Sequence, residues 1–289
     1  MDLNKVILTP NPYRDKNFQT LREALRVLKD AGLETRVCLP FTVDKSFDLP
    51  RDISFSRLDR ELPTASMVIC FGGDGTILHM SKTATRNGIP ILGVNIGTMG
   101  FMAELESTEV SQLYRLATGP YSVVDRMMLD VTVHRDRDII FHDICLNDAV
   151  ITKGAIARII HTAVNCDGVQ AMECGGDGVI IATPTGSTAY SLSAGGPIVE
   201  PEAHSILITP ICAHDVASRS IVASDKRVIT VNLTRNARQN AFLSVDGGKA
   251  LKMSMGDVIT VRKSNLVTKL VRLKERSFYD VVNNKFRIG

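Results

Sequence analysis

The chain has 289 residues, and its 34 Lys and Arg residues against 31 Asp and Glu residues leave a formal charge of +3 at pH 7. This balance excludes a basic tail and argues against DNA, RNA or an anionic membrane as the main partner. Hydrophobic residues make up 44% of the chain and charged residues 22%, which excludes a disordered or collagen-like protein. The length predicts two domains.

The first residues, Met1 to Leu8, lack the basic start, apolar core and cleavage site of a secretory signal. No stretch approaches the roughly 18 consecutive apolar residues of a membrane span. The six cysteines contain no CxxC pair and the six histidines form no cluster, so we expect reduced thiols and no protein-held metal. Together these features predict a soluble, cytoplasmic protein.

Residues 1–125 alternate short apolar runs with helical patterns, which is typical of βαβ units around a parallel sheet. The expected strands cover residues 6–8, 37–39, 67–71 and 91–94. The expected helices run from Phe18 to Leu28, ended by Gly32, and over residues 77–86, ended by Gly88. Residues 40–60 are expected to form a loose connection.

Residues 126–273 change to strands with few helical intervals. The expected strands are 128–134, 139–142, 144–152, 159–166, 169–172, 179–182, 228–233, 242–245, 258–261 and 266–273. Asp167-Gly168 and Asp246-Gly247 predict two-residue hairpin turns, and residues 186–194 are compatible with a short helix. The predicted fold class is α/β: a Rossmann-like three-layer domain at 1–125, a mostly-β, sandwich-like domain at 126–273, and a C-terminal segment, 274–289, that returns to the first domain.

The clearest candidate site is the run Gly72-Gly73-Asp74-Gly75-Thr76, which joins an expected strand to a helix at the edge where α/β proteins bind ligands. Glycines let backbone N–H groups approach a phosphate, and a helix start adds partial positive charge. Because a carboxylate repels phosphate, Asp74 either holds a metal or accepts a proton from an attacking hydroxyl. The alternative is a tight turn that uses Gly and Asp for backbone reasons alone.

A second Gly-Gly-Asp-Gly run, residues 175–178, precedes a strand instead, so we expect no internal duplication. It leads into residues 182–197, where seven of sixteen residues are Ser, Thr or Tyr. Small side chains, glycines and hydroxyls can together bind ribose, amide or phosphate oxygens. A solvated Ser/Thr-rich loop is the alternative.

Taken together, these motifs resemble those of the NAD kinase family, whose members use ATP or polyphosphate. Residues 72–76 match the first family motif, which lipid kinases of the diacylglycerol kinase type share. Residues 93–101 and 209–214 resemble further family blocks, and residues 278–286 resemble its C-terminal end. Leu146-Asn147-Asp148 stands where the family has Asn-Glu. Residues 176–197 match the family's longest motif almost throughout, and this is the most specific part of the resemblance.

The resemblance implies transfer of a donor's terminal phosphoryl group to the 2′-hydroxyl of the adenosine ribose of NAD, which forms NADP, with Mg²⁺ or another divalent cation accompanying the donor. It also implies a homodimer or homotetramer with shared active sites. Asp74 is the implied catalytic base. The implied binding residues are Gly72, Gly73, Gly75 and Thr76 for phosphates, Phe101 for the dinucleotide, Asn147 and Asp148 for ribose hydroxyls, and Asp177, Thr188, Ala189, Tyr190 and Ser193 for adenine, amide or ribose groups. Ser191 and His214 are further candidates for substrate binding. Arg158 and Lys153 follow the Asn-Asp motif and could contact a pyrophosphate, whereas lone basic residues are more often solvated.

Asp148 is one methylene shorter than the family's Glu, and Gly248 replaces a common Gln. His214 fits a buried, hydrogen-bonded histidine as well as a ligand contact. Two other functions stay open on sequence alone. One is a lipid kinase that shares the first motif, although the hydroxyl-rich run suits a dinucleotide better than a lipid. The other is an NAD(H)-binding module without turnover.

Overall fold

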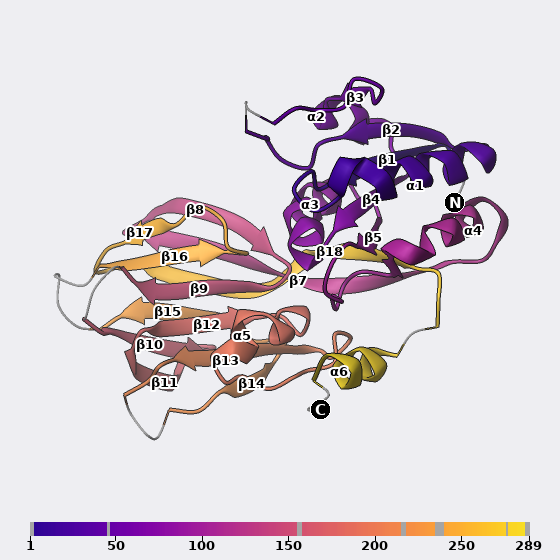
Figure 1. Ribbon diagram of the computed structural model, residues 1–289. Helices are drawn as coiled ribbons and strands as arrows, with labels where there is room; N and C mark the ends of the chain where they lie inside the picture. The colour runs from indigo at the N-terminus through magenta and orange to yellow at the C-terminus, as the bar shows by residue number, and fades with distance from the viewer. Residues whose placement is uncertain are drawn as a thin grey trace. The chain divides into compact units, whose positions relative to one another are not determined.

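The computed structural model describes residues 3–44, 47–154, 158–214, 218–234, 240–275 and 277–286. The chain divides into two compact units: Met1–Asp125 together with Thr268–Gly289 form unit 1, and Arg126–Val267 form unit 2 (Figure 1). Unit 1 is therefore discontinuous in sequence, whereas unit 2 is continuous. Among the described helices, none is long and apolar enough to cross a membrane.

Unit 1 is built on a parallel sheet with the strand order β3-β2-β1-β4-β5. Strand β5 also pairs in parallel with β6 and, through Leu270, with the end of β18. The strands are β1 (Lys5–Pro10), β2 (Glu34–Cys38), β3 (Phe55–Ser56), β4 (Met67–Gly72), β5 (Ile91–Asn95), β6 (Leu105–Glu106) and β18 (Val258–Arg272). Strands β1, β2, β4 and β5 overlap the expected strands at 6–8, 37–39, 67–71 and 91–94. The sequence did not predict β3 and β6.

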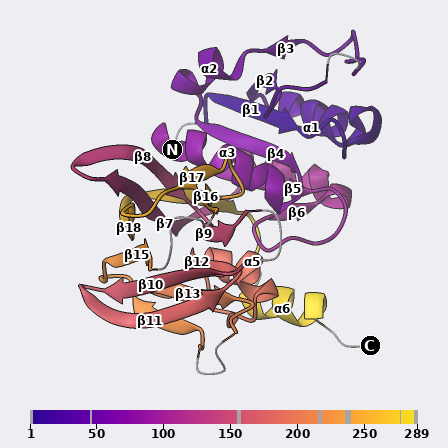
Figure 2. The same ribbon diagram turned by 90° about the vertical axis from the view of Figure 1, so that its left-hand side faces the viewer.

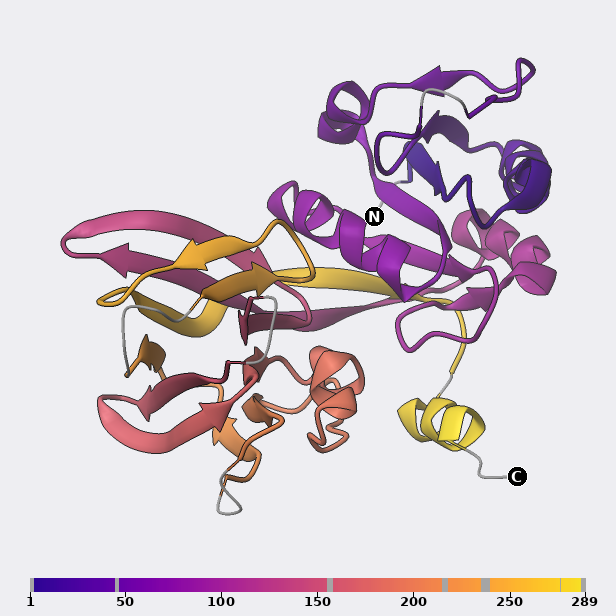
Figure 3. The same cartoon turned by 60° about the vertical axis from the view of Figure 1, so that its left-hand side comes forward.

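Side-chain alternation decides which helix each face of this sheet meets. Leu92 and Val94 pack in one cluster with Leu21 of α1 (Gln19–Asp30). Gly93, between them, faces α3 (Asp74–Arg86), because a Cβ there would lie 2.4 Å from Cδ1 of Ile77. The two helices therefore cover opposite faces, which confirms the three-layer arrangement (Figure 3). The other helices of unit 1 are η1 (Lys16–Phe18), α2 (Leu58–Glu61), η2 (Leu62–Thr64), η3 (Ser107–Tyr114), α4 (Arg115–Thr118) and α6 (Phe278–Phe286).

Helix α1 begins one residue later than its apolar spacing predicted. Phe18 is in the left-handed region with φ 55°, so it lies just outside the helix. The buried carboxylate of Asp15 accepts hydrogen bonds from the N–H groups of Thr20 (3.0 Å) and Leu21 (2.9 Å), which otherwise lack helical partners. At the other end, Gly32 has φ 78°, as expected of a left-handed cap.

A buried carboxylate fastens the returning end of the chain to unit 1. Glu104 is 1% exposed and accepts hydrogen bonds from the Arg272 guanidinium (3.0 Å) and from the N–H groups of Leu273 (2.8 Å) and Lys274 (2.7 Å). A bond of 2.8 Å between the buried hydroxyls of Thr85 and Thr268 holds the start of the same segment. A buried charge of this kind is tolerated because it is fully hydrogen-bonded.

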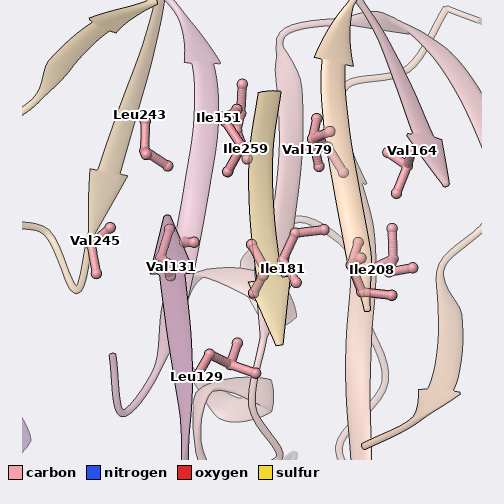
Figure 4. Packing of buried hydrophobic residues seen from close by; sticks show 14 of the residues in the cluster. Leu129, Val131, Ile151, Val164, Val179, Ile181, Ile208, Leu243, Val245 and Ile259 are labelled. Carbon is pink, nitrogen blue, oxygen red and sulfur yellow. The ribbon is translucent and has the colours of Figure 1, made fainter. Parts of the chain in front are cut away.

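Unit 2 consists of two antiparallel sheets whose inner faces share one apolar core. Ile151, Ile181 and Ile208 come from one sheet and meet Val131 and Ile259 of the other (Figure 4). The first sheet has the order β14-β13-β12-β9-β16-β17, and the second runs β11-β10-β15-β18, with β7 pairing with both β18 and β8. The strands are β7 (Ser122–Arg135), β8 (Asp138–Cys145), β9 (Asp148–Lys153), β10 (Ile160–Cys166), β11 (Val169–Gly176), β12 (Gly178–Ala182), β13 (Ser205–Ile211), β14 (Ile221–Ser224), β15 (Ile229–Leu233), β16 (Ala241–Val245) and β17 (Leu251–Met253).

This confirms the mostly-β prediction, although β13, β14 and β17 were not predicted and the predicted strands need two corrections. The run expected as one strand over 144–152 is broken, because β8 ends at Cys145 and β9 begins at Asp148. The runs expected as two strands, 258–261 and 266–273, are one continuous strand, β18. Asp167-Gly168 forms the predicted two-residue turn: Asp167 has φ 51°, and β10 and β11 lie side by side as a hairpin (Figure 2). Asp246 also has φ 51°, and the Gly248 N–H closes the turn on the Val245 carbonyl at 3.0 Å. The link from β16 to β17 is nevertheless longer than predicted, because their pairing ends at Leu243 and Leu251.

Candidate active site

The carboxylate of Asp74 is held in place by the backbone of a neighbouring loop. Asp74 is the first residue of α3 and follows β4 after a single residue, Gly73. One of its oxygens accepts a hydrogen bond from the N–H of Phe101 (2.7 Å), and the other from the N–H of Met102 (3.0 Å). Both oxygens are therefore oriented before any ligand binds.

Two glycines allow this close packing. At Gly100, an added Cβ would lie 2.1 Å from Oδ1 of Asp74, so only glycine fits against the carboxylate. At Gly72, an added Cβ would lie 2.2 Å from Oγ1 of Thr76. That hydroxyl accepts a 3.1 Å hydrogen bond from the Asn11 side chain, which ties the turn to the end of β1. Positions 72 and 100 therefore require glycine for steric reasons, in addition to any requirement for ligand access.

Asp74 lines a cavity of about 340 Å³ within unit 1. Two side chains in its wall are cationic: Arg14, whose Nη1 lies 3.6 Å from where a Cβ on Gly73 would be, and Lys285. With the start of α3 they make the cavity suitable for an anion. Its full lining is Asn11, Arg14, Phe41, Gly73, Asp74, Gly75, Thr76, His79, Thr98, Met99, Gly100 and Lys285.

Eight of these lining residues were not among the predicted site residues, although Thr98, Met99 and Gly100 lie in the family-like block 93–101 and Lys285 in the family-like segment 278–286. Asn11 and Arg14 follow β1, whose carboxyl end lies beside that of β4, so the parallel-sheet rule that located Asp74 could have found them too. Phe41 and His79 had no comparable signal, because their positions depend on tertiary packing.

The ring of Phe101 packs against α6. Its centroid lies 6.1 Å from those of both Phe278 and Phe286, and Nζ of Lys285 lies 4.5 Å above the ring. The same ammonium group donates a 3.0 Å hydrogen bond to the carbonyl of Met99. Helix α6 therefore supports the loop whose N–H groups hold Asp74.

In unit 2, Asn147 lies on the turn between β8 and β9, and Asp148 is the first residue of β9. The carbonyl of Asn147 accepts a 2.9 Å bond from the N–H of Thr183, at the start of the hydroxyl-rich run. Gly186 is pressed against the same turn, since a Cβ there would lie 2.1 Å from the Asn147 carbonyl oxygen. The structure thus brings together the Asn-Asp motif and the longest family-like motif. Oδ1 of Asn147 is buried and has no hydrogen-bond partner in the described structure.

Asp148 is 5% exposed. Burial, and then the nearby Asp246 carboxylate, raise the pKa of Asp148 to about 7. A carboxyl group that titrates near neutral pH is unusual and is a common feature of ligand sites.

The hydroxyl-rich run forms two short helices, η4 (Thr185–Thr188) and α5 (Tyr190–Ser193). Tyr190 is 43% exposed, whereas Ser191 is buried and bonded at 2.8 Å to the hydroxyl of Thr209. The Thr188 hydroxyl donates to the carbonyl of Thr185 at 3.3 Å. The short-helix prediction for this stretch is confirmed, and Ser191 faces the protein interior. Ala189 and Ser193 lie at the start and end of α5, where the Ser193 N–H donates to the Ala189 carbonyl.

Asp177, His214 and Arg158 occupy the remaining predicted positions. The Asp177 carboxylate pairs with Lys153 at 2.7 Å. The N–H of His214 donates to the carbonyl of Gly175 at 2.9 Å, so residues 175–177 and 211–214 lie together. Arg158 is exposed. Asp215, which follows His214, lies outside the described residues.

Comparison with known proteins identifies relatives over nearly the whole chain. Residues 6–119 match the ATP-NAD kinase N-terminal domain, and residues 146–273 match the ATP-NAD kinase C-terminal domain. An NAD kinase of Ruminiclostridium cellulolyticum is 37% identical over 98% of this chain and 98% of its own length.

Two solved structures have the same fold. A yeast NADH kinase complexed with NADH has a TM-score of 0.83 at 24% identity and covers 99% of this chain and 89% of its own. An NAD kinase from Archaeoglobus fulgidus in complex with ATP has a TM-score of 0.75 at 25% identity and covers 99% of this chain and 100% of its own. On these matches, the chain belongs to the NAD kinase family of phosphoryl transferases.

Proposed function

We propose that this chain transfers the terminal phosphoryl group of ATP or polyphosphate to the 2′-hydroxyl of the adenosine ribose of NAD. Membership of the family gives the reaction, and the placement of Asp74 supports its assignment as the base. Its carboxylate, held by two backbone N–H groups, lines a cavity with cationic walls. A proton acceptor beside an anion site is the arrangement that attack of a hydroxyl on a phosphate requires.

In the proposed step, the ribose 2′-oxygen forms a bond to the terminal phosphorus as its proton passes to the Asp74 carboxylate. The bond from phosphorus to the bridging oxygen breaks, and the shortened donor leaves with that electron pair. Arg14 and Lys285 stabilise the negative charge of the donor phosphates, together with N–H groups at the start of α3. Because secondary hydroxyls barely ionise at neutral pH, the carboxylate is essential for the rate.

Asn147 and Asp148 are proposed to bind ribose hydroxyls. The buried Oδ1 of Asn147, without a protein partner in the described structure, supports this assignment because a buried acceptor normally needs a donor. Oγ1 of Thr185, buried and without a partner in the same part of unit 2, is a second such group. We also propose binding roles for Phe101, Arg158, Asp177, Thr188, Ala189, Tyr190, Ser193 and His214, on the family resemblance.

A divalent cation fits this chain only as a companion of the donor. Asp74 is the sole carboxylate among the described residues lining the cavity, and the described residues contain no cluster of three or more metal-ligating groups. Mg²⁺ commonly binds through substrate phosphates and keeps several waters, so a cation arriving on the donor would neutralise part of the phosphate charge. We further propose a cytoplasmic homo-oligomer with shared sites, as the resemblance implies.

The test is to incubate purified protein with NAD, Mg²⁺ and either ATP or polyphosphate, and to measure NADP with an NADP-specific dehydrogenase. NADP formation with either donor identifies that donor, and its absence with both contradicts the proposal. In the variant D74N, kcat should fall about 10²-fold or more while NAD binding stays near the wild-type level. The matched control is D30N, which changes an exposed aspartate of α1. The comparisons do not favour the lipid kinase alternative.

A further inference from the structure

We propose that Asp246 is a positioning residue for NAD, because its carboxylate shapes the turn that presents Asn147 and Asp148 to the ribose. This inference rests on the proposed function, since it assigns Asp246 to the ribose-binding part of that site. It adds a residue that lies outside the motifs from which the site was predicted.

One carboxylate binds every N–H group of the turn. Oδ1 of Asp246 accepts hydrogen bonds from the N–H groups of Asn147 (2.8 Å) and Asp148 (3.2 Å), and Oδ2 accepts from Leu146 (2.9 Å). In return, the N–H of Asp246 donates to the carbonyl of Asp148 at 2.9 Å. Bonds from N–H groups to an ionised acceptor are stronger than neutral ones, so Asp246 defines the conformation of the turn from nearly 100 residues away in sequence.

The opposite side of the turn is bonded as well. The Thr183 hydroxyl donates to the Leu146 carbonyl, and the Thr183 N–H donates to the Asn147 carbonyl. The backbone of the turn thus has its hydrogen bonds satisfied by protein, whereas Oδ1 of Asn147 has no partner in the described structure. What is left for a ligand is the side chains, in positions that the backbone bonds fix. A preorganised site of this kind binds more tightly because less conformational entropy is lost on binding.

Asp246 is also the charged group that faces Asp148. Strand β9 pairs with β12, where uncharged Ala182 lies opposite Asp148. On its other side β9 pairs with β16, which leads into Asp246, and η4 contributes only uncharged residues. Burial is the main cause of the raised pKa of Asp148, and the Asp246 charge raises it further. Since an ionised carboxylate accepts hydrogen bonds from ribose hydroxyls, NAD affinity should rise with pH through about 7.

The decisive variant is D246N. Asparagine tolerates the left-handed φ of 51° and suits a hairpin turn before glycine, but it loses the charge and one of the two acceptor oxygens. We expect the Kd and KM for NAD to rise about tenfold and kcat to change less than about threefold. The midpoint of the pH dependence of Kd should move to lower pH, because the repelling charge is gone.

The matched control is D167N. Asp167 has the same φ of 51° in the other Asp-Gly turn, and its carboxylate accepts bonds from the N–H of Val228 (2.9 Å) and from Arg227 (2.8 Å). This variant should keep the wild-type Kd, KM and pH midpoint. Binding is measured by calorimetry on the full chain at several pH values, and D148N, which lacks the titrating group, should show no transition.

If D246N matches D167N in Kd and pH midpoint, Asp246 does not position the turn and the inference is wrong. If wild-type NAD affinity is constant through neutral pH, the inference is wrong even when D246N does not fold. A wild-type protein that neither binds NAD nor forms NADP instead contradicts the proposed function. A protein that forms NADP but is insensitive to D246N leaves that function intact.

Discussion

Replacing Gly100 with alanine tests directly whether the position of the Asp74 carboxylate governs the rate. The added methyl group would lie 2.1 Å from Oδ1 and 2.6 Å from Cγ of Asp74, whereas ordinary contacts begin at 3.4 Å. To restore normal contact, the carboxylate must move by about 1.3 Å, which breaks its 2.7 Å and 3.0 Å bonds to the N–H groups of Phe101 and Met102. A displacement of about 1 Å in a reacting group costs about 10²-fold in rate, so kcat should fall by about that factor.

The assay is NADP formation at saturating NAD and donor, with thermal unfolding measured in parallel. The matched control is G119A in the same unit, where the nearest atom to an added Cβ is 3.4 Å away and φ is −121°. G119A should keep wild-type kcat. If G100A folds and retains kcat within about threefold, the carboxylate can be displaced without loss, and the assignment of Asp74 as the base is refuted.

Three further predictions concern the wider site. Burial, and then Asp246, raise the pKa of Asp148 to about 7. The folded chain therefore keeps a proton on Asp148 that the unfolded chain loses above about pH 4. The free energy of unfolding, compared with that of D148N, should thus fall between about pH 4 and about pH 8. Urea unfolding at both pH values checks this, and an unchanged difference contradicts it. K285M removes one of the two cationic side chains that line the cavity. The KM for the phosphate donor should therefore rise about tenfold at low ionic strength and less at high salt, where charges are screened. Steady-state kinetics at two salt concentrations measures this. T183V removes the hydroxyl that is hydrogen-bonded to the Leu146 carbonyl and the Gly186 N–H. Urea unfolding should show that the free energy of unfolding falls by about 2 kcal/mol or more. A loss below about 0.5 kcal/mol would mean that these two backbone groups find other partners.

Local patterns predicted the parts of this fold that depend on local physics. The apolar runs at β1, β4 and β5 and the left-handed Asp-Gly turns at Asp167 and Asp246 form as expected, because a continuous apolar run and a turn with positive φ are both encoded by adjacent residues. The same patterns failed at residues 146–147. There the run expected as one strand, 144–152, is broken beside the polar Asn147 and Asp148, and the break is held by a carboxylate far away in sequence.

The candidate site likewise contains residues that local patterns predicted and residues that they did not. The Gly-Asp-Gly turn was visible because glycine and a carboxylate together are chemically unusual next to phosphate, and the Thr185–Ser193 run because hydroxyls are concentrated there. Arg14 was not found although it follows β1, which pairs with β4. His79 and Lys285 were not found because lone basic residues are usually solvated, and only the tertiary structure brings these two to one cavity. Gly100 was part of a family-like block, but its steric contact with Asp74 appears only in three dimensions.

The attachment of the C-terminal segment to Glu104 has a consequence for biosynthesis. Unit 2 is one continuous stretch that ends at Val267, whereas unit 1 lacks Arg272, Leu273 and Lys274 until the ribosome has passed them. Before that point Glu104 is a carboxylate without its three donors, and burying it would be costly. Unit 1 therefore cannot bury Glu104 with its charge satisfied until β18, the last strand of unit 2, has also been synthesised, so the N-terminal sheet cannot be completed ahead of the rest of the chain.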